Sequence, residues 1–343
     1  MILEAVFFLF LYNIAPSVSR THEDTYFPGN VTETIFNVEW ITCLQACHNH
    51  PECISYNYHK DNNTCEINSD GLKEQCDSRS KIYSRGWTFH QIRPVPEEKP
   101  VPELGDHPST AAETCEEIFN KRRSAPSGAY YIRIGDKAHL VYCKMENTTC
   151  GEGGWALVMK INGSKTTFAY SSPLWKNIDS YNEDGGRDFS DTETKVGPLF
   201  GSFTFKKGLC VGMKIGGHTK WLLLTEIKNT NLMGIFSREG PEGFTLGRSK
   251  WKSLIEGSSM HNSCTTPKEG FNVHASNGAD GAKARIGLIG YKDCEGEPMS
   301  RIGFGTEGSS GGMDTSNTCG NEATASADNG NKTIKAFCYI LLK

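Results

Sequence analysis

Two glycine-rich motifs near the end of this 343-residue chain match patterns of cofactor and catalytic sites. Residues 303–308 satisfy G-x-G-x-x-G, and residues 308–312 satisfy G-x-S-x-G with Ser310 in the nucleophile position. Both patterns function only between a strand and a helix. Ser309-Ser-Gly-Gly312 cannot begin a stable helix, and no histidine follows Ser310 to act as a base. The sequence therefore predicts a protein that is not an enzyme, with a Ser310 hydrolase as the remaining catalytic alternative.

The 13 cysteines carry the clearest chemistry in the chain. All of them follow residue 19, and no C-x-x-C occurs, which argues against structural zinc and thioredoxin-type redox chemistry. In an oxidising compartment, they form a disulfide framework. Because 13 is an odd number, at least one cysteine is free, buried or bonded to another chain. We expect Cys76 to be available for a disulfide-linked oligomer.

Residues 1–19 have the pattern of a signal peptide, so we expect a secreted, extracellular protein. An apolar run over residues 5–12 is too short to span a membrane, and Ser17 and Ser19 precede Arg20 as small residues at a cleavage site. The segment begins without a basic residue, and a buried N-terminal helix is the alternative. Five N-x-[ST] sequons agree with export and predict surface glycans. They are Asn30, Asn62, Asn147, Asn162 and Asn331.

Charge and hydropathy exclude two classes of protein. The 36 Lys and Arg residues against 40 Asp and Glu give a net charge of −4, so no basic excess exists to bind nucleic acid. Beyond the leader, no apolar run approaches the ~20 residues that a membrane span needs. We therefore expect neither nucleic-acid binding nor a membrane span.

A composition change near residue 94 divides the chain. Residues 93–110 contain five prolines and predict a semi-rigid linker, since proline prevents a helix or a central strand. Residues 24–92 then form a small first domain and residues 111–343 a larger second one. Of the 36 glycines, only four precede residue 111, so the second domain is expected to be rich in irregular loops.

The first domain has the pattern of a helix stapled to a sheet. Apolar positions in residues 38–50 follow a helical period, and Cys43 and Cys47, four apart, share one face. Residues 53–58 alternate as a strand, and a turn then leads to Cys65 in a second strand. A module this small needs covalent staples to be stable. We expect an α+β module with its helix on an antiparallel sheet.

The run Cys43-x3-Cys47-x5-Cys53-x-Ser-Tyr-x-Tyr…Cys65 resembles a PAN/apple domain. The resemblance implies the pairs Cys43–Cys65 and Cys47–Cys53, and a module that contacts proteins or carbohydrates without catalysis. Many apple domains also bridge their terminal strands. Cys76 has no cysteine partner in residues 20–42, so that bridge is expected to be absent or rearranged.

The second domain opens with a short helix at Cys115, strands near residues 128–132 and 141–145, and a Gly-rich turn into Trp155. Its motifs Cys-x-x-Ile, Ser-Gly-x-Tyr-x-Ile, Val-Tyr-Cys-x-Met and Gly-Gly-Trp resemble the fibrinogen C-terminal domain and its intelectin-like relatives. The resemblance implies an α+β fold with irregular loops, a Cys115–Cys143 disulfide and a Cys264–Cys294 disulfide. The remaining Cys150, Cys210, Cys319 and Cys338 allow three pairings.

The second resemblance also implies recognition of glycans, acetylated groups or partner proteins, often beside calcium. A calcium ion takes six to eight oxygens, and the candidate ligands here are Asp280, Asp293 and Asp314. Asn317 and Glu322 near Cys319 belong to the same group of loop residues, and the alternative is that these polar side chains are solvated. The fibrinogen-type Asp-x-Asp calcium loop is absent, so the sequence predicts no certain cofactor and leaves calcium as the one candidate.

These observations predict a secreted recognition or adhesion protein that binds carbohydrate or glycoprotein ligands. The alternative is a structural extracellular-matrix protein that acts through multivalent adhesion and disulfide cross-links. The combination of a PAN-like and a fibrinogen-like domain is similar to that of invertebrate secreted proteins, including coral skeletal-matrix proteins. A mineral-templating role has less support, because the chain has no Asp-rich run.

Overall fold

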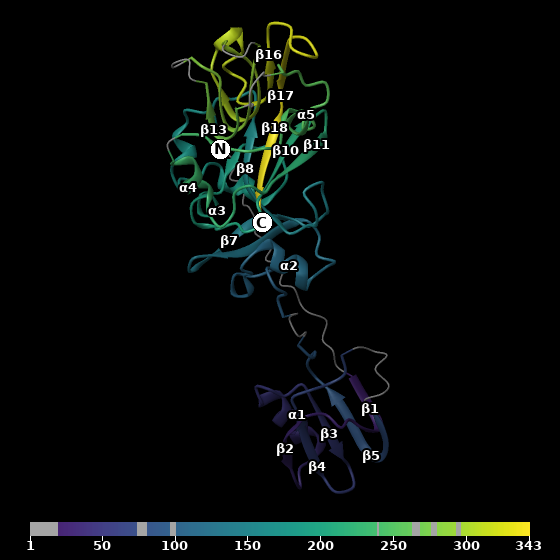
Figure 1. Ribbon diagram of the computed structural model, residues 1–343. Helices are drawn as coiled ribbons and strands as arrows, with labels where there is room; N and C mark the ends of the chain where they lie inside the picture. The colour runs from purple at the N-terminus through teal and green to yellow at the C-terminus, as the bar shows by residue number, and fades with distance from the viewer. Residues whose placement is uncertain are drawn as a thin grey trace, which may run out of the picture. The chain divides into compact units, whose positions relative to one another are not determined.

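The computed structural model describes residues 20–73, 81–96, 101–238, 240–262, 268–275, 280–292 and 296–343. Contacts within the chain divide it after Pro100 into two compact units, which are described separately (Figure 1). Both are built mainly from antiparallel strands with few helices. The expected α+β class is confirmed, with a sheet-rich second unit. The predicted signal peptide, residues 1–19, lies outside the described residues.

Among its described residues, the N-terminal unit has one five-stranded sheet and one helix, α1 (Trp40–Asn49). The strand order is β1-β5-β3-β4-β2. The bounds of the strands are β1 (Arg20–Tyr26), β2 (Val31–Ile35), β3 (Ser55–His59), β4 (Thr64–Asn68) and β5 (Ile82–Gln91). β1 pairs along β5, so the unit begins at least four residues before the expected start at residue 24. The sequence pattern missed this strand because most of its side chains are polar.

Alternation along the strands places the core of this unit under the helix. Tyr56, Tyr58 and Ile67 point to the side of α1, where Cys43 and Cys47 are fully buried. Cys43 is bonded to Cys65 on β4, and a second disulfide joins Cys47, near the end of α1, to Cys53, just before β3. The helix is therefore held to the sheet by both a small apolar core and covalent bonds.

The second unit contains two larger antiparallel sheets. The first has the order β11-β10-β18-β8-β7-β6, with β9 paired to β8, and the second has the order β12-β13-β14-β15-β16-β17. The strands of the first sheet are β6 (Gly128–Ile134), β7 (Lys137–Lys144), β8 (Trp155–Asn162), β9 (Thr194–Lys195), β10 (Leu209–Ile215), β11 (His218–Leu224) and β18 (Phe337–Leu342). The strands of the second are β12 (Glu242–Gly243), β13 (Lys268–His274), β14 (Lys283–Tyr291), β15 (Pro298–Glu307), β16 (Cys319–Ala323) and β17 (Lys332–Lys335).

The helices among the described residues of this unit are short. They are α2 (Cys115–Lys121), α3 (Gly197–Ser202), α4 (Leu232–Phe236) and α5 (Arg248–Lys252), with 3-10 turns η2 (Pro108–Thr110), η3 (Pro173–Trp175), η4 (Glu183–Arg187) and η5 (Ser310–Gly312). The C-terminal segment forms two strands, β17 and β18, separated at Ala336. The second of them, β18, lies between β10 and β8 in the middle of its sheet (Figure 1).

The seven-stranded sheet is apolar on both faces. Val211, Met213 and Ile340 belong to the main core on one face, while Tyr339 and its neighbours form an aromatic cluster on the other. In that cluster Phe189 stacks on Tyr339 with ring centroids 4.2 Å apart. Alternate side chains of an antiparallel strand point to opposite faces, so β8, β10 and β18 each contribute side chains to both clusters.

The Gly-rich turn before β8 is required by close packing. A Cβ on Gly153 would lie 1.9 Å from the carbonyl oxygen of Met145, and Gly154 has a φ of +90° with Glu116 Cα 2.8 Å from where its Cβ would be. Only glycine fits these two positions. The turn therefore sets how closely the start of β8 approaches α2 and the end of β7.

The predicted linker is shorter than expected. Residues 101–110 belong to the second unit, because Tyr131 donates a backbone hydrogen bond to Gly105 and Arg122 bonds the Leu104 carbonyl and the Asp106 carboxylate. Leu104 also packs against the main core. The expectation of a linker running to residue 110 was therefore wrong. The prolines exclude a helix or a central strand, but they do not prevent Leu104, Gly105 and Asp106 from packing against the second unit.

Candidate binding site

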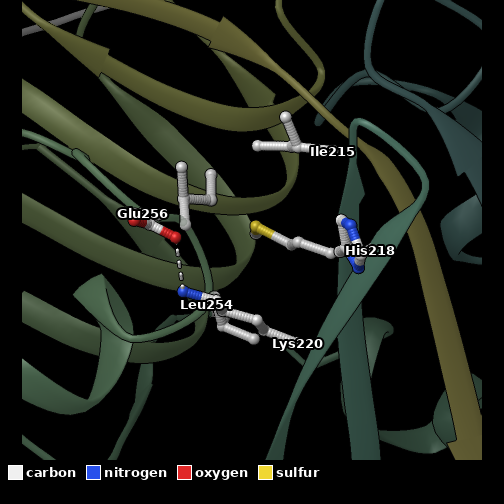
Figure 2. Close-up of a pocket in the computed structure, with 7 residues that line it drawn as sticks. Ile215, His218, Lys220, Leu254 and Glu256 are labelled. Atoms are coloured by element: carbon white, nitrogen blue, oxygen red, sulfur yellow. Dashed lines mark hydrogen bonds and ion pairs between the residues drawn. The ribbon is translucent and has the colours of Figure 1, made fainter.

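A pocket of about 340 Å³ opens at the tip of the β10–β11 hairpin. Two segments distant in sequence form it, the hairpin and the turn that follows α5 (Figure 2). The lining residues are Met213, Ile215, His218, Lys220, Leu254, Ile255 and Glu256. This volume lies at the lower end of the range for small-molecule sites, so the pocket suits a small ligand or one side chain of a larger one.

The hairpin turn determines which side chains enter the pocket. Gly216 and Gly217 both have positive φ, +57° and +85°, the conformation of a two-residue hairpin turn of the type that favours glycine. This turn pairs Ile215 with His218 and Met213 with Lys220. Directly paired residues lie on the same face of a sheet, so the hairpin presents two apolar and two basic side chains together.

The pocket has an apolar floor and a charged rim. Met213, Leu254 and Ile255 are nearly fully buried, whereas the Lys220 and Glu256 side chains are 47% and 92% exposed. Their ion pair spans 3.5 Å from Nζ to Oε2 and is visible in Figure 2, where His218 stands apart from it. An exposed pair at this distance contributes little to stability, so both charges remain available to a ligand.

Sequence reasoning missed every residue of this pocket. The Gly216-Gly217 turn was the one local signal, since it predicts a hairpin. The approach of residues 254–256 depends on how α5 packs, which no local pattern encodes. The sequence therefore pointed instead to the later acidic loops.

The calcium candidates do not come together as a site. Asp314 accepts hydrogen bonds from the Ser316 amide (2.8 Å) and hydroxyl (2.7 Å), and its other oxygen lies 3.0 Å from Lys335 Nζ. Bonding from Ser316, and then from Lys335, lowers the pKa of Asp314 to about 2. Asp280 is exposed, and Asp293 lies outside the described residues. Within the described ranges, no group of three or more His, Cys, Asp or Glu residues could hold a metal ion.

The neighbouring polar loop residues form an internal network. Buried Glu322 accepts a hydrogen bond from Asn317 Nδ2 (2.7 Å) and another from the Thr333 hydroxyl (3.0 Å). The buried Arg301 guanidinium donates to the carbonyls of Glu307 (3.1 Å) and Asp314 (2.6 Å), and its burial lowers the pKa to about 10. These groups hold the loops in place, so Asn317 and Glu322 are neither solvated nor grouped around an open site.

Ser310 is also engaged in structure. Its hydroxyl donates to the Pro298 carbonyl (3.1 Å) and accepts from the Ala282 amide (3.1 Å). The preceding glycine motif lies largely within β15, and only the three-residue turn η5 follows it. The strand–turn–helix context that either chemistry requires does not occur at this position.

Five disulfides join described cysteines. Cys43–Cys65, Cys47–Cys53 and Cys115–Cys143 are the pairs that the two resemblances implied, and Cys150–Cys210 and Cys319–Cys338 resolve the four cysteines left open. Cys76, Cys264 and Cys294 lie outside the described residues. The bonded cysteines are almost completely shielded from solvent, as expected of structural disulfides.

The five sequons differ in accessibility. Asn30, Asn62, Asn147 and Asn331 are exposed, whereas Asn162 is half-buried and its Oδ1 accepts a hydrogen bond from the Ser164 amide (3.0 Å). A glycan must project into solvent. We therefore expect Asn162 to be the least readily modified of the five.

The N-terminal unit has an apolar surface of its own. Phe36, Trp40 and Ile41, around the start of α1, are 67%, 43% and 47% exposed. Exposed apolar residues gathered in one segment are typical of interaction surfaces. No described helix in either unit has the length and apolar character to cross a lipid bilayer.

Comparison with known proteins agrees with the architecture of the first unit. No curated protein matches the chain. The family model for the PAN domain matches residues 18–92, the segment that contains the stapled helix and all five strands of the first sheet. PAN domains mediate contacts with proteins or carbohydrates, and five disulfides are typical of extracellular proteins. Residues 18–92 of this chain are a PAN domain.

Proposed function

We propose that this protein is a secreted, non-enzymatic recognition and adhesion protein that binds carbohydrate or glycoprotein ligands outside the cell. The observation that carries the proposal is the PAN domain at residues 18–92, with its helix stapled to the sheet by Cys43–Cys65 and Cys47–Cys53. The exposed apolar residues around α1 supply a surface for a partner. The fibrinogen-like character of the second unit rests on the motifs around Cys115, Cys143 and Trp155.

The test is binding of the full-length secreted chain to an array of glycans and matrix glycoproteins, with and without EDTA. We expect specific binding to at least one class of ligand. Loss of the signal in EDTA would indicate a calcium requirement, whereas an unchanged signal would remove it. Correctly folded protein that binds nothing under either condition would contradict the proposal.

The cysteine count favours a second candidate, a cross-linked matrix component. Ten of the 13 cysteines form the five described disulfides, which leaves Cys76, Cys264 and Cys294. Three cysteines cannot all pair within one chain. For a cross-linked matrix component, we expect a disulfide-linked dimer on a non-reducing gel. The Cys76→Ser variant should not form this dimer. A monomer for the unmodified chain would remove the cross-linking role and leave recognition untouched.

A further inference from the structure

We propose that the pocket at the β10–β11 hairpin binds a small amphipathic carboxylate, a compact hydrocarbon group that ends in a carboxyl group. This goes beyond the proposed recognition of carbohydrate or glycoprotein, and its evidence lies wholly in the second unit. The pocket combines a buried apolar floor with a basic rim in about 340 Å³. A ligand of this class would satisfy both parts at once.

The floor selects a hydrocarbon group. Ile215, 38% exposed, offers accessible apolar surface to a ligand. Met213, Leu254 and Ile255 behind it are 1%, 1% and 2% exposed, so they are fixed by the core and hold the pocket in shape. Burying one methylene strengthens binding roughly fourfold, so affinity should rise steeply with the length of the hydrocarbon until the pocket is full.

The rim selects a carboxylate. Lys220 and His218 supply a basic Nζ and a ring nitrogen, while Glu256 is the single acid in the lining. The Lys220–Glu256 distance of 3.5 Å is longer than the 2.7–2.9 Å of a strong charged hydrogen bond, and Glu256 is 92% exposed. A ligand carboxylate can therefore take the place of Glu256 beside Lys220.

The surrounding charges do not compete for this position. Lys214, next to Met213 on β10, has its Nζ 2.8 Å from an Asp191 carboxylate oxygen, and Lys252 of α5 is held by Asp328. The lining contains no Trp, Tyr or Phe ring on which a neutral sugar could stack. A cationic ligand would be repelled by Lys220. An anionic, partly apolar ligand fits the pocket better than either of these.

The experiment is ligand-observed saturation-transfer NMR on the full-length chain, with affinities from titration. The probes are 4-methylpentanoate, its neutral analogue 4-methylpentanamide, and acetate. We expect the carboxylate to bind at least tenfold more tightly than the amide, and acetate to bind too weakly to measure. Equal binding of the acid and the amide, or no saturation transfer to the acid, would overturn the proposal.

Two variants of the ion pair give opposite expectations. Lys220→Gln should weaken 4-methylpentanoate at least fivefold, because it removes the cation. Glu256→Gln should strengthen it severalfold, because it removes the competing acid. Lys228→Gln, an exposed lysine outside the pocket, is the matched control and should change nothing. Changes in the same direction for Lys220→Gln and Glu256→Gln would contradict a carboxylate site.

The ligand carboxylate could belong to a free acid or to the C-terminus of a peptide. A hexapeptide ending in leucine, compared with the same peptide amidated at its C-terminus, distinguishes these sources. Tighter binding of the free-acid peptide than of 4-methylpentanoate assigns the pocket to a protein C-terminus, and weaker binding assigns it to a small molecule. Failure of the glycan and glycoprotein array would leave these titrations unaffected, so the two proposals fail separately.

Discussion

The two units of the chain are stabilised in different ways. The principal core of the N-terminal unit is Tyr56, Tyr58 and Ile67 with four half-cystines, and no ion pair involves its described residues. The second unit buries several dozen apolar side chains in its main cluster and holds all 18 ion pairs found among the described residues. A small domain buries too little surface to be stable without staples.

The two units also differ in how many large apolar side chains they expose. Among the residues that the structure describes, nine large apolar side chains are exposed, and six of them lie in the N-terminal unit: Val31, Phe36, Trp40, Ile41, Ile82 and Tyr83. A unit held by disulfides can leave apolar residues on its surface, because its stability does not require burying them. The first unit therefore offers exposed apolar surface for contacts with partners, and the second unit offers a small pocket.

The largest expected effect is the loss of a staple. The Cys43–Cys65 bond closes a loop of 22 positions, which corresponds to roughly 3–4 kcal/mol of unfolding free energy. Cys43→Ser with Cys65→Ser should unfold the N-terminal unit at ordinary temperature and leave the second unit folded. Scanning calorimetry should show the disappearance of one transition.

The matched control is removal of Cys319–Cys338, which closes a similar loop of 19 positions in the second unit. That variant should lower the melting temperature of the second unit without unfolding it, because the large core remains. If both variants behaved alike, the contrast between the two units would be wrong.

The next effect concerns binding by the exposed surface around α1. The double variant Phe36→Ser, Trp40→Ser should weaken binding of the ligand found on the array by about 1–2 kcal/mol or more, since aromatic residues often dominate the binding energy of interfaces. Ile178→Ser, at a side chain 51% exposed in the second unit, is the control. Surface plasmon resonance with the array ligand measures the difference. Equal affinities of the two variants for this ligand would mean that the ligand does not bind at the PAN domain surface around α1.

A smaller effect should appear in the second unit at low pH. Partial burial acts to raise the pKa of Asp328, but hydrogen bonds from Lys252 and the Met260 amide, with the charges of Lys252 and Arg248, outweigh it and lower the pKa to about 2. A carboxyl whose folded pKa is depressed stabilises the fold above its ordinary pKa, near 4, and loses that contribution as pH falls toward 2. The contribution is about 1–2 kcal/mol at neutral pH after allowance for partial exposure.

Asp328→Asn should therefore lower stability at pH 7 and make the unfolding free energy of the second unit less dependent on pH between 4 and 2. Urea unfolding followed across this range measures both quantities. An unchanged pH dependence would mean that the bridge from α5 to residue 328 does not stabilise the unit.

The smallest effect is expected at the rim of the pocket. Glu256→Gln should change the unfolding free energy by less than about 0.5 kcal/mol, because the Lys220 pair is exposed and long. Thermal unfolding of this variant checks it. A larger loss of unfolding free energy would mean that the Lys220–Glu256 ion pair stabilises the fold. A ligand carboxylate would then displace Glu256 from Lys220 less readily.

The sequence was most informative where spacing is local. Cys43 and Cys47 at i and i+4 predicted one helical face, and α1 places both in the core. The Gly153-Gly154-Trp155 motif likewise predicted the turn into a buried strand. In both places the residue types constrain the backbone directly, so a short stretch of sequence is enough.

The sequence was least informative where distant segments meet. The pocket forms because Leu254 and Ile255 pack beside Met213, about 40 positions earlier in the chain, and no periodic pattern encodes that approach. Asp314 looked like a metal ligand in the sequence, yet Lys335 and Ser316 already occupy its oxygens. Acidic residues in loops cannot be assigned until their hydrogen-bond partners are known.

Disulfide mapping by mass spectrometry of the secreted, non-reduced chain tests the central claim most directly. That claim is that two extracellular units are locked by their own cysteines, the first as a stapled PAN domain. The expected peptides link Cys43 to Cys65, Cys47 to Cys53, Cys115 to Cys143, Cys150 to Cys210, and Cys319 to Cys338. Free thiols at Cys43, Cys65, Cys115 and Cys143 would contradict the account.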